Sequence, residues 1–186
     1  MFTWRDINKD KNISSYYFKN ITLLVNNIKL NYSLMKNKII LYFTLHHKLF
    51  EYKYKFKINQ YIKYIEENEI SECLSKIKLV VTDFSSIIFD LIYQRKPYII
   101  YIPDADDPEN ELNYKPNYYK LIQSLKNETI YFKNKFFEID KVVNKILYYI
   151  NNNFSLEPEL EMFYNSFHLN KENNINKFIT YISKII

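Results

Sequence analysis

The chain has 186 residues, of which 47% are hydrophobic, and its formal net charge is +5. This length suits one domain of ordinary size with its own core. Glycine is absent, which excludes both a Walker A loop and a glycine-rich dinucleotide fingerprint. The only cysteine, Cys73, excludes a disulfide framework and a cysteine metal site, and its neighbours SECLSKI predict a buried core position.

The positive charge is spread along the chain rather than gathered in one run. It favours anionic ligands such as nucleotide diphosphates, whereas a nucleic-acid binder would need a clustered cationic face. The longest apolar runs are about five residues, far short of the roughly 20 that span a bilayer. The N-terminus also lacks the order of a signal peptide. We therefore expect a cytosolic protein that is soluble, or bound at most to a membrane surface.

Helical and extended patterns alternate in the first half of the chain. Apolar residues at a period near 3.6 predict one helix over 21–35, with Asn20 as its cap. Residues 38–45 (KIILYFTL) predict a buried strand, and the alternating aromatic and charged residues 50–57 predict an exposed extended segment. Two short elements follow: a strand near 61–65 and a helix over 70–77.

The alternation continues in the second half. Residues 78–82 (KLVVT) predict a buried strand, 86–94 a helix that ends before Pro97, and 98–102 another buried strand. Prolines and clustered Asp and Asn then indicate a loop, in which turns with positive φ would use Asn or Asp. The remaining predicted elements are a helix over 118–125, a strand over 129–132 and helices over 139–152, 157–167 and 173–186.

This order of elements predicts an α/β fold, with a Rossmann-like parallel sheet, helices on both faces and a helical C-terminus. Ligands in such folds bind at the carboxyl ends of the strands. Both His46-His47 and Asp83–Ser86 follow predicted strands. We therefore expect these two segments to share one site.

The segment KLVVTDFSSIIFD leads from a strand into a helix through Thr82, Asp83, Ser85 and Ser86. A helix N-terminus with hydroxyls beside it is a common phosphate site, because its N–H groups and dipole attract anions. Serine is also a favoured N-cap, so a purely structural role is the alternative. Asp90 shares a helix face with Ser86 and is expected either near a ribose or glycerol hydroxyl or in solvent.

Three blocks in order carry a family resemblance. The run KLVVTDFSSIIFDLIYQRKPYIIYIPD resembles the TDYSS segment of CDP-glycerol glycerophosphotransferases, the teichoic-acid and capsule polymerases of bacteria, with Phe84 in place of the tyrosine. Thr3-Trp4-Arg5 is similar to the family's ThrTrpArg motif. The run LYFTLHHKL resembles the family's strand that ends in a histidine.

The resemblance implies a fold and a reaction. The family has a GT-B fold, so residues 1–186 would form one CDP-alcohol-binding domain, with the N-terminal acceptor domain absent and the first strand cut short. Glycerol phosphate, or a related polyol phosphate, would pass from a CDP-alcohol to a hydroxyl of a teichoic-acid or capsule-type polymer, with release of CMP. No cofactor or metal is implied. The acceptor would be a lipid-linked polyol phosphate or glycan, at the inner face of the cell membrane.

The resemblance also assigns residues. His46 or His47 would be catalytic, and His46 matches best because the family has a proline after its histidine. Arg5 would contact phosphate. Near the C-terminus, Lys171-Glu172 and Lys177 stand where the family has AspGly and an arginine. Lysine keeps the charge but loses the bidentate geometry. The second hypothesis is therefore a truncated, inactive nucleotide-binding fragment that needs a separate chain to supply the N-terminal domain.

Overall fold

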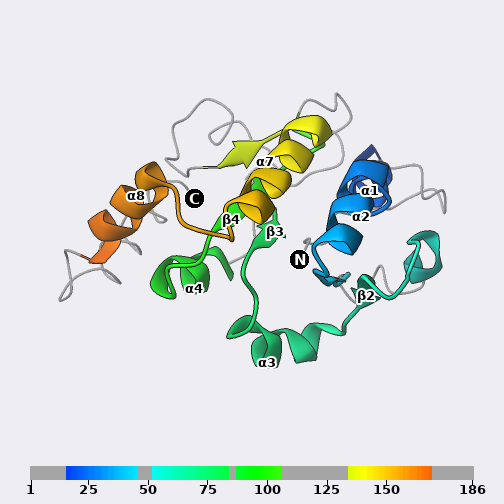
Figure 1. Cartoon of the computed structure of the whole chain (residues 1–186), viewed down its shortest axis with the longest axis horizontal. Coiled ribbons are helices and arrows are strands. Elements are labelled where there is room, and N and C mark those ends of the chain that lie inside the picture. Colours follow the sequence, from blue (N-terminus) through cyan, green and yellow to red (C-terminus); the bar gives the residue numbers. More distant parts are fainter. Residues whose placement is uncertain (1–15, 46–51, 84–86, 106–133, 169–186) are drawn as a thin grey trace, which may run out of the picture.

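The computed structural model describes residues 16–45, 52–83, 87–105 and 134–168, and shows an α/β arrangement of short strands and helices (Figure 1). In chain order the elements are α1 (Tyr16–Val25), α2 (Ile28–Lys36), β1 (Leu41–Phe43), β2 (Ile62–Tyr64), the 3-10 helix η2 (Glu67–Glu69), α3 (Ile70–Leu74), β3 (Val80–Thr82), α4 (Ile87–Tyr93), β4 (Tyr98–Tyr101), β5 (Lys135–Phe136), α7 (Ile139–Asn151) and α8 (Pro158–His168). The predicted elements over 118–125, 129–132 and 173–186 lie outside the described residues.

All the strands of the described part pair in parallel. β1 lies beside β2, with Leu41 opposite Ile62. β4 lies between β3 and β5, with Val80 of β3 opposite Tyr98 and Lys135 of β5 opposite Ile100. Parallel strands need crossover connections, and α4 lies in the connection between β3 and β4.

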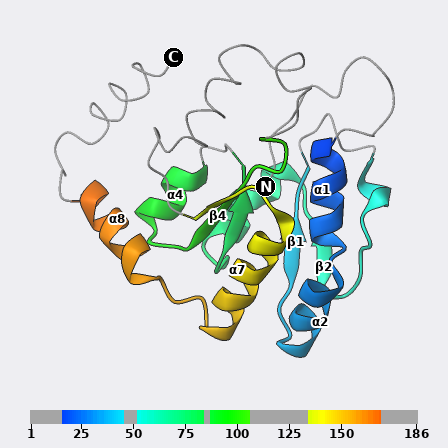
Figure 2. The same ribbon diagram turned by 90° about the horizontal axis from the view of Figure 1, so that it is seen from above.

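The central strand β4 is buried on both faces. Ile99 and Tyr101 belong to a core that also contains residues of α1, α2 and α7. Tyr98 and Ile100 belong to a second core with residues of α4 and α8. Figure 2 shows these two groups of helices on opposite sides of β4. The predicted Rossmann-like class, with helices on both faces of parallel strands, is therefore confirmed.

The predicted single helix over 21–35 is wrong, because two helices meet at Asn26 and Asn27. Asn27 has an extended backbone (φ −62°, ψ 126°), and its side chain accepts a hydrogen bond from the Leu30 N–H at 3.1 Å. This N-cap begins α2. The expected cap Asn20 instead lies inside α1. The Asn26 carboxamide oxygen accepts from the Lys57 N–H at 3.0 Å, so the break also fixes a distant segment.

The expected exposed extended segment over 50–57 is also wrong where the structure describes it. Residues 52–55 form a 3-10 turn, and Phe56 is buried. The Phe56 ring lies 5.7 Å from that of Phe18 and 4.7 Å from that of Phe43. The aromatic residues of this segment therefore close one core. Cys73, expected to be buried, is only partly buried.

Five described residues, none of them glycine, have positive φ: Lys38, Arg95, Asn134, Asn153 and Phe154. The expectation that Asn or Asp would fill such positions holds for two of the five. Lysine, arginine and phenylalanine hold the other three, although an L-residue with a Cβ is destabilised in the left-handed region by about 1–2 kcal/mol. A chain without glycine carries this strain at its helix ends.

The end of α2 shows how the strain arises. The Ile39 N–H donates to the Leu34 carbonyl at 2.9 Å, and the Lys38 N–H donates to the Met35 carbonyl at 3.2 Å. These two bonds form a Schellman motif, which requires a left-handed residue at the position of Lys38. Lys38 meets this requirement with φ 53°.

Replacing Lys38 with glycine should therefore stabilise the protein, because glycine adopts this conformation without a steric cost. We expect Lys38→Gly to raise the free energy of unfolding by about 1 kcal/mol, measured by urea denaturation. The control is Lys19→Gly on an exposed position inside α1, which should lower it by about 1 kcal/mol. Equal effects of the two substitutions would contradict this account.

Candidate functional site

Four polar or charged side chains of the described part are buried, and all lie at or beyond the carboxyl end of a strand: Thr44, Thr82, Asp83 and Asp104. Thr44 follows β1, Thr82 ends β3 and Asp83 follows it, while the last of the four follows β4. None is more than 5% exposed. Burial of polar groups is costly unless they find partners, so their concentration at one kind of position marks a candidate ligand site.

The first turn of α1 contacts this site. The Tyr17 hydroxyl donates to Oδ2 of Asp83 at 2.7 Å, across 66 positions of sequence. Both side chains are buried, Tyr17 at 3% and Asp83 at 0% exposure. A hydrogen bond to a carboxylate is shorter and stronger than one between neutral groups. The α1 helix and the end of β3 are therefore joined by a polar contact within the protein.

The same turn of α1 reaches the end of β1. Phe18, next to Tyr17, packs edge to face on Phe56, and Phe56 packs on Phe43, the last residue of β1. Consecutive residues of α1 thus contact Asp83 after β3 and the aromatic group at the end of β1. The first turn of α1 therefore lies near the carboxyl ends of both β1 and β3.

Side chains of neighbouring residues at the end of β3 point to opposite faces of the sheet. Val81 packs against the core that contains α1, whereas Val80 belongs to the core that contains α4. Because side chains alternate along a strand, Thr82 faces the α4 side and Asp83 faces the α1 side. The Tyr17 contact agrees with this alternation. Asp83 thus lies between the sheet and α1, and Thr82 between the sheet and α4.

The two buried threonine hydroxyls are unusual. Oγ1 of Thr82 and Oγ1 of Thr44 have no hydrogen-bond partner among the described residues. A buried hydroxyl without a partner costs about 1–3 kcal/mol, and most buried polar groups avoid this cost. Two such hydroxyls at strand ends could donate hydrogen bonds to a bound molecule or accept hydrogen bonds from it.

The structure describes three of the predicted site residues. Thr82 and Asp83 lie together at the end of β3, as expected. Asp90 is exposed on α4, whose buried side carries Leu91 and Ile92, so it agrees with the solvent-facing alternative and its binding role stays a prediction. The others lie outside the described residues: Arg5, His46, His47, Ser85, Ser86 and Lys177. Sequence analysis missed Tyr17, Thr44 and Asp104.

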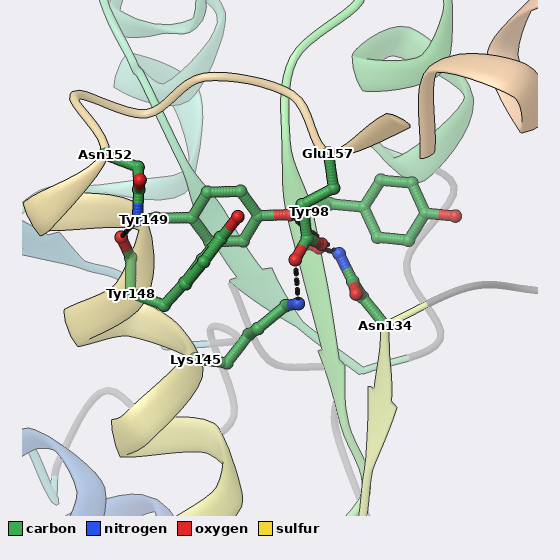
Figure 3. A network of polar contacts seen from close by, with 7 residues as sticks. All are labelled: Tyr98, Asn134, Lys145, Tyr148, Tyr149, Asn152 and Glu157. Atoms are coloured by element: carbon green, nitrogen blue, oxygen red, sulfur yellow. Dashed lines mark hydrogen bonds and ion pairs between the residues drawn. The ribbon is translucent and has the colours of Figure 1, made fainter. Parts of the chain in front are cut away.

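A separate polar network lies at the opposite, amino edge of the β3–β5 sheet (Figure 3). Asn134, just before β5, donates to the Tyr98 carbonyl at 3.2 Å and to the Tyr149 hydroxyl at 2.8 Å. Tyr149 in turn donates to Oε2 of Glu157 at 3.1 Å, and Lys145 forms an ion pair with the same carboxylate. The network joins α7, and the segment that precedes α8, to the start of β4.

This network is structural in character. Burial, followed by the nearby Glu157 carboxylate, raises the pKa of Tyr149, so the phenol stays protonated and keeps donating. The side chains of Lys145 and Glu157 are 20% and 19% exposed, and their charges satisfy each other. An open hollow of ≈ 450 Å³ beside them lies at the amino edge, away from the edge where ligands bind in α/β folds.

Within the described ranges, no helix is long and apolar enough to cross a membrane. Nor do their His, Cys, Asp and Glu residues form a group of three or more that could hold a metal ion.

Comparison with known proteins gives the family. The sequence profile described as "CDP-Glycerol:Poly(glycerophosphate) glycerophosphotransferase" matches residues 1–155. The minor teichoic acid biosynthesis protein GgaB of Bacillus subtilis (strain 168) is 28% identical over 106 residues, which cover 56% of this chain and 11% of that protein. No solved structure matches. Since the profile spans most of its length, the chain belongs to the CDP-glycerol:poly(glycerophosphate) glycerophosphotransferase family.

Proposed function

We propose that this chain is the donor-binding domain of a GT-B-type transferase that acts on a CDP-alcohol. The donor would be CDP-glycerol or a related polyol derivative, and the acceptor a hydroxyl of a teichoic-acid or capsule-type polymer. Family membership supports the class of reaction. The placement of the site rests on one observation, the set of buried polar side chains at the carboxyl ends of the strands.

Each part of the donor suits different residues of the chain. Ser85 and Ser86, with the N–H groups at the start of α4, hold the diphosphate. Asp83 would repel a phosphate, so it binds a hydrogen-bond donor of the ligand, such as a ribose or polyol hydroxyl. Arg5 and Lys177 are the cations that balance the charge of the diphosphate.

The reaction is a phosphoryl transfer. The acceptor oxygen attacks the phosphorus that carries the polyol, the bond from that phosphorus to the bridging oxygen breaks, and CMP leaves. His46, or its neighbour His47, takes the proton of the attacking hydroxyl, which is the role an imidazole performs best near neutral pH. Cations and N–H groups stabilise the charge that develops on the leaving phosphate.

The binding site of the acceptor lies outside this domain. The polymer is lipid-linked, so the domain works at the inner face of the cell membrane. A facing domain, from the same protein or from a separate chain, holds the acceptor and excludes water. The region aligned with GgaB covers 11% of that protein, so this chain spans only a small part of its length.

Ligand-induced stabilisation tests the donor site. At a concentration 100 times the Kd, CDP-glycerol should raise the free energy of unfolding by about 2.7 kcal/mol. This raises Tm by about 5–10 °C, measured by differential scanning fluorimetry. UDP should give a smaller shift than CDP, and Ser85→Ala/Ser86→Ala should lose most of the shift with CDP.

These measurements test the donor-binding function, the two serines and His46 separately. No shift with any cytidine nucleotide would exclude the donor-domain function. An unchanged shift in the double serine variant would exclude only the phosphate role of the serines. His46→Ala should bind CDP-glycerol normally and lose turnover, because its proposed role lies in the chemical step.

One departure from the family favours a second candidate, a nucleotide-binding domain without transfer activity. Lys171-Glu172 and Lys177 replace the family's AspGly and arginine, and lysine cannot form the bidentate phosphate contact of arginine. CDP-glycerol binding without CMP release, in the presence of a teichoic-acid acceptor, would identify this alternative. If Lys177→Arg gained transfer activity, the lysine at this position would be the reason that the unaltered protein lacks it.

A further inference from the structure

We infer that the outer side of α2 is a docking surface for an anionic lipid bilayer. Ile28, Tyr32 and Met35 form an exposed apolar stripe along this helix, and lysines lie beside the stripe. The inference rests on the membrane placement in the proposed function and names the surface responsible for it. It does not use the donor site, so donor binding and membrane binding can be tested separately.

The helix α2 has two apolar sides. Leu30 and Leu34 are buried, at 1% and 2% exposure, and belong to the core that contains residues of α1 and α7. Ile28, Tyr32 and Met35 follow one another at spacings of four and three residues, so they share the opposite side of the helix. They are 84%, 62% and 49% exposed. A helix that only covers a core carries polar residues on its outer side, so the stripe points to a further contact.

The charge around the stripe is positive. Lys29 and Lys36 are exposed and lie three and four residues from Tyr32, so they border the stripe on one side. Lys38, just after the helix, is also exposed. Residues 11–50 of the sequence contain no aspartate or glutamate. Figure 2 shows α2 at the periphery of the described part, so this basic and apolar surface faces outward.

This combination suits an anionic bilayer better than a protein. In helices that lie at a membrane surface, apolar side chains enter the acyl boundary, while lysines stay among headgroups that attract them when these are anionic. Tyrosine is also enriched at that depth. A stripe of this size is small for a stable protein interface, which buries about 800 Å² on each partner. In a symmetric dimer the same lysines would meet and repel each other.

Co-sedimentation with vesicles tests this surface. The intact chain is mixed with vesicles of phosphatidylcholine and phosphatidylglycerol at a ratio of about 7:3, or with vesicles of phosphatidylcholine alone. We expect binding to the mixed vesicles only, because the lysines need anionic headgroups. Raising the ionic strength from about 0.1 to 1 M shortens the Debye length from about 10 to 3 Å and should release most of the protein.

A matched pair of variants tests the apolar stripe. Tyr32→Ser/Met35→Ser should lower the partition coefficient on the mixed vesicles at least about tenfold, because two apolar side chains no longer enter the bilayer. The control, Tyr93→Ser/Met162→Ser, removes the same two residue types from exposed positions on α4 and α8. It should leave the partition coefficient unchanged.

A second pair tests the lysines. Lys29→Gln/Lys36→Gln should weaken binding to the mixed vesicles about tenfold, since each lysine near an anionic surface contributes to the attraction. Lys63→Gln/Lys76→Gln makes the same change in net charge at exposed positions on β2 and after α3, and should have a much smaller effect.

Three results would contradict the inference. The first is failure of the intact chain to bind the mixed vesicles, and the second is an equal loss in a test pair and its control. The third is a dimer in size-exclusion chromatography that Tyr32→Ser/Met35→Ser converts to a monomer, which would assign the stripe to a second copy of the chain. The Tm shift with CDP should be the same in Tyr32→Ser/Met35→Ser as in the unaltered chain. Loss of vesicle binding with this shift intact would leave the donor-binding function standing.

Discussion

Leu91→Ala should destabilise this protein by about 3 kcal/mol, because it opens a cavity beneath the helix that begins at the site. Leu91 is 0% exposed and lies in one core with Ile88, Ile92 and Ile100. Truncation removes the transfer free energy of the side chain and leaves a void that the parallel strands cannot fill. For a chain of this size, Tm should fall by about 6–12 °C in differential scanning calorimetry.

The control lies on the same helix. Tyr93 is 78% exposed, so Tyr93→Ala should change the free energy of unfolding by less than about 1 kcal/mol. Similar losses in the two variants would mean that α4 does not pack on β4 as described. Because α4 follows Ser86 directly, Leu91→Ala should also weaken CDP binding more than Tyr93→Ala does.

The parts of the fold that sequence predicted correctly are those with a strong local pattern. YIIYI reads as a continuous apolar run, and the structure buries Tyr98–Tyr101 on both faces. This pattern arises because a parallel strand between two layers of helices has no solvent face. The helix α7 was likewise predicted within one residue, since its apolar residues keep a regular period over 13 positions.

The errors occur where a distant contact decides the structure. The pattern over 21–35 stays apolar at helical spacing across Asn26-Asn27, and only the cap made by Asn27 reveals two helices. Likewise, residues 52–57 look exposed because charges alternate with aromatics. Phe56 is buried because Phe18 and Phe43 come from two other elements to meet it. Such partners cannot be predicted from the local sequence, because they come from distant parts of the chain.

The residues of the candidate site also fall into those that the local sequence predicts and those that depend on distant contacts. Thr82 and Asp83 were predicted because strand ends are where α/β folds bind ligands, and a strand end is visible in sequence. Asp104 could have been found by the same rule, since it follows the buried strand β4. Tyr17 could not, because it reaches the site from a helix through a contact across 66 positions. A residue that joins a site through a contact distant in sequence can be identified only once the structure is known.

Thr82→Val should have opposite effects on stability and on binding. Oγ1 of Thr82 is buried and has no partner among the described residues, so the hydroxyl destabilises the ligand-free protein. Valine has nearly the same shape and no polar atom. We therefore expect the free energy of unfolding to rise by about 1 kcal/mol, while the affinity for CDP-glycerol falls about tenfold.

Thr22→Val is the control for this argument. Thr22, on α1, already donates its hydroxyl to the Phe18 carbonyl at 2.9 Å, so valine gains no relief from an unpaired group and should leave affinity unchanged. A rise in stability without a loss of affinity in Thr82→Val would mean that its hydroxyl has no ligand. A fall in both would mean that the hydroxyl has a partner within the protein. Only the opposed pair of effects indicates a residue kept for binding at a cost in stability, as is common at functional sites.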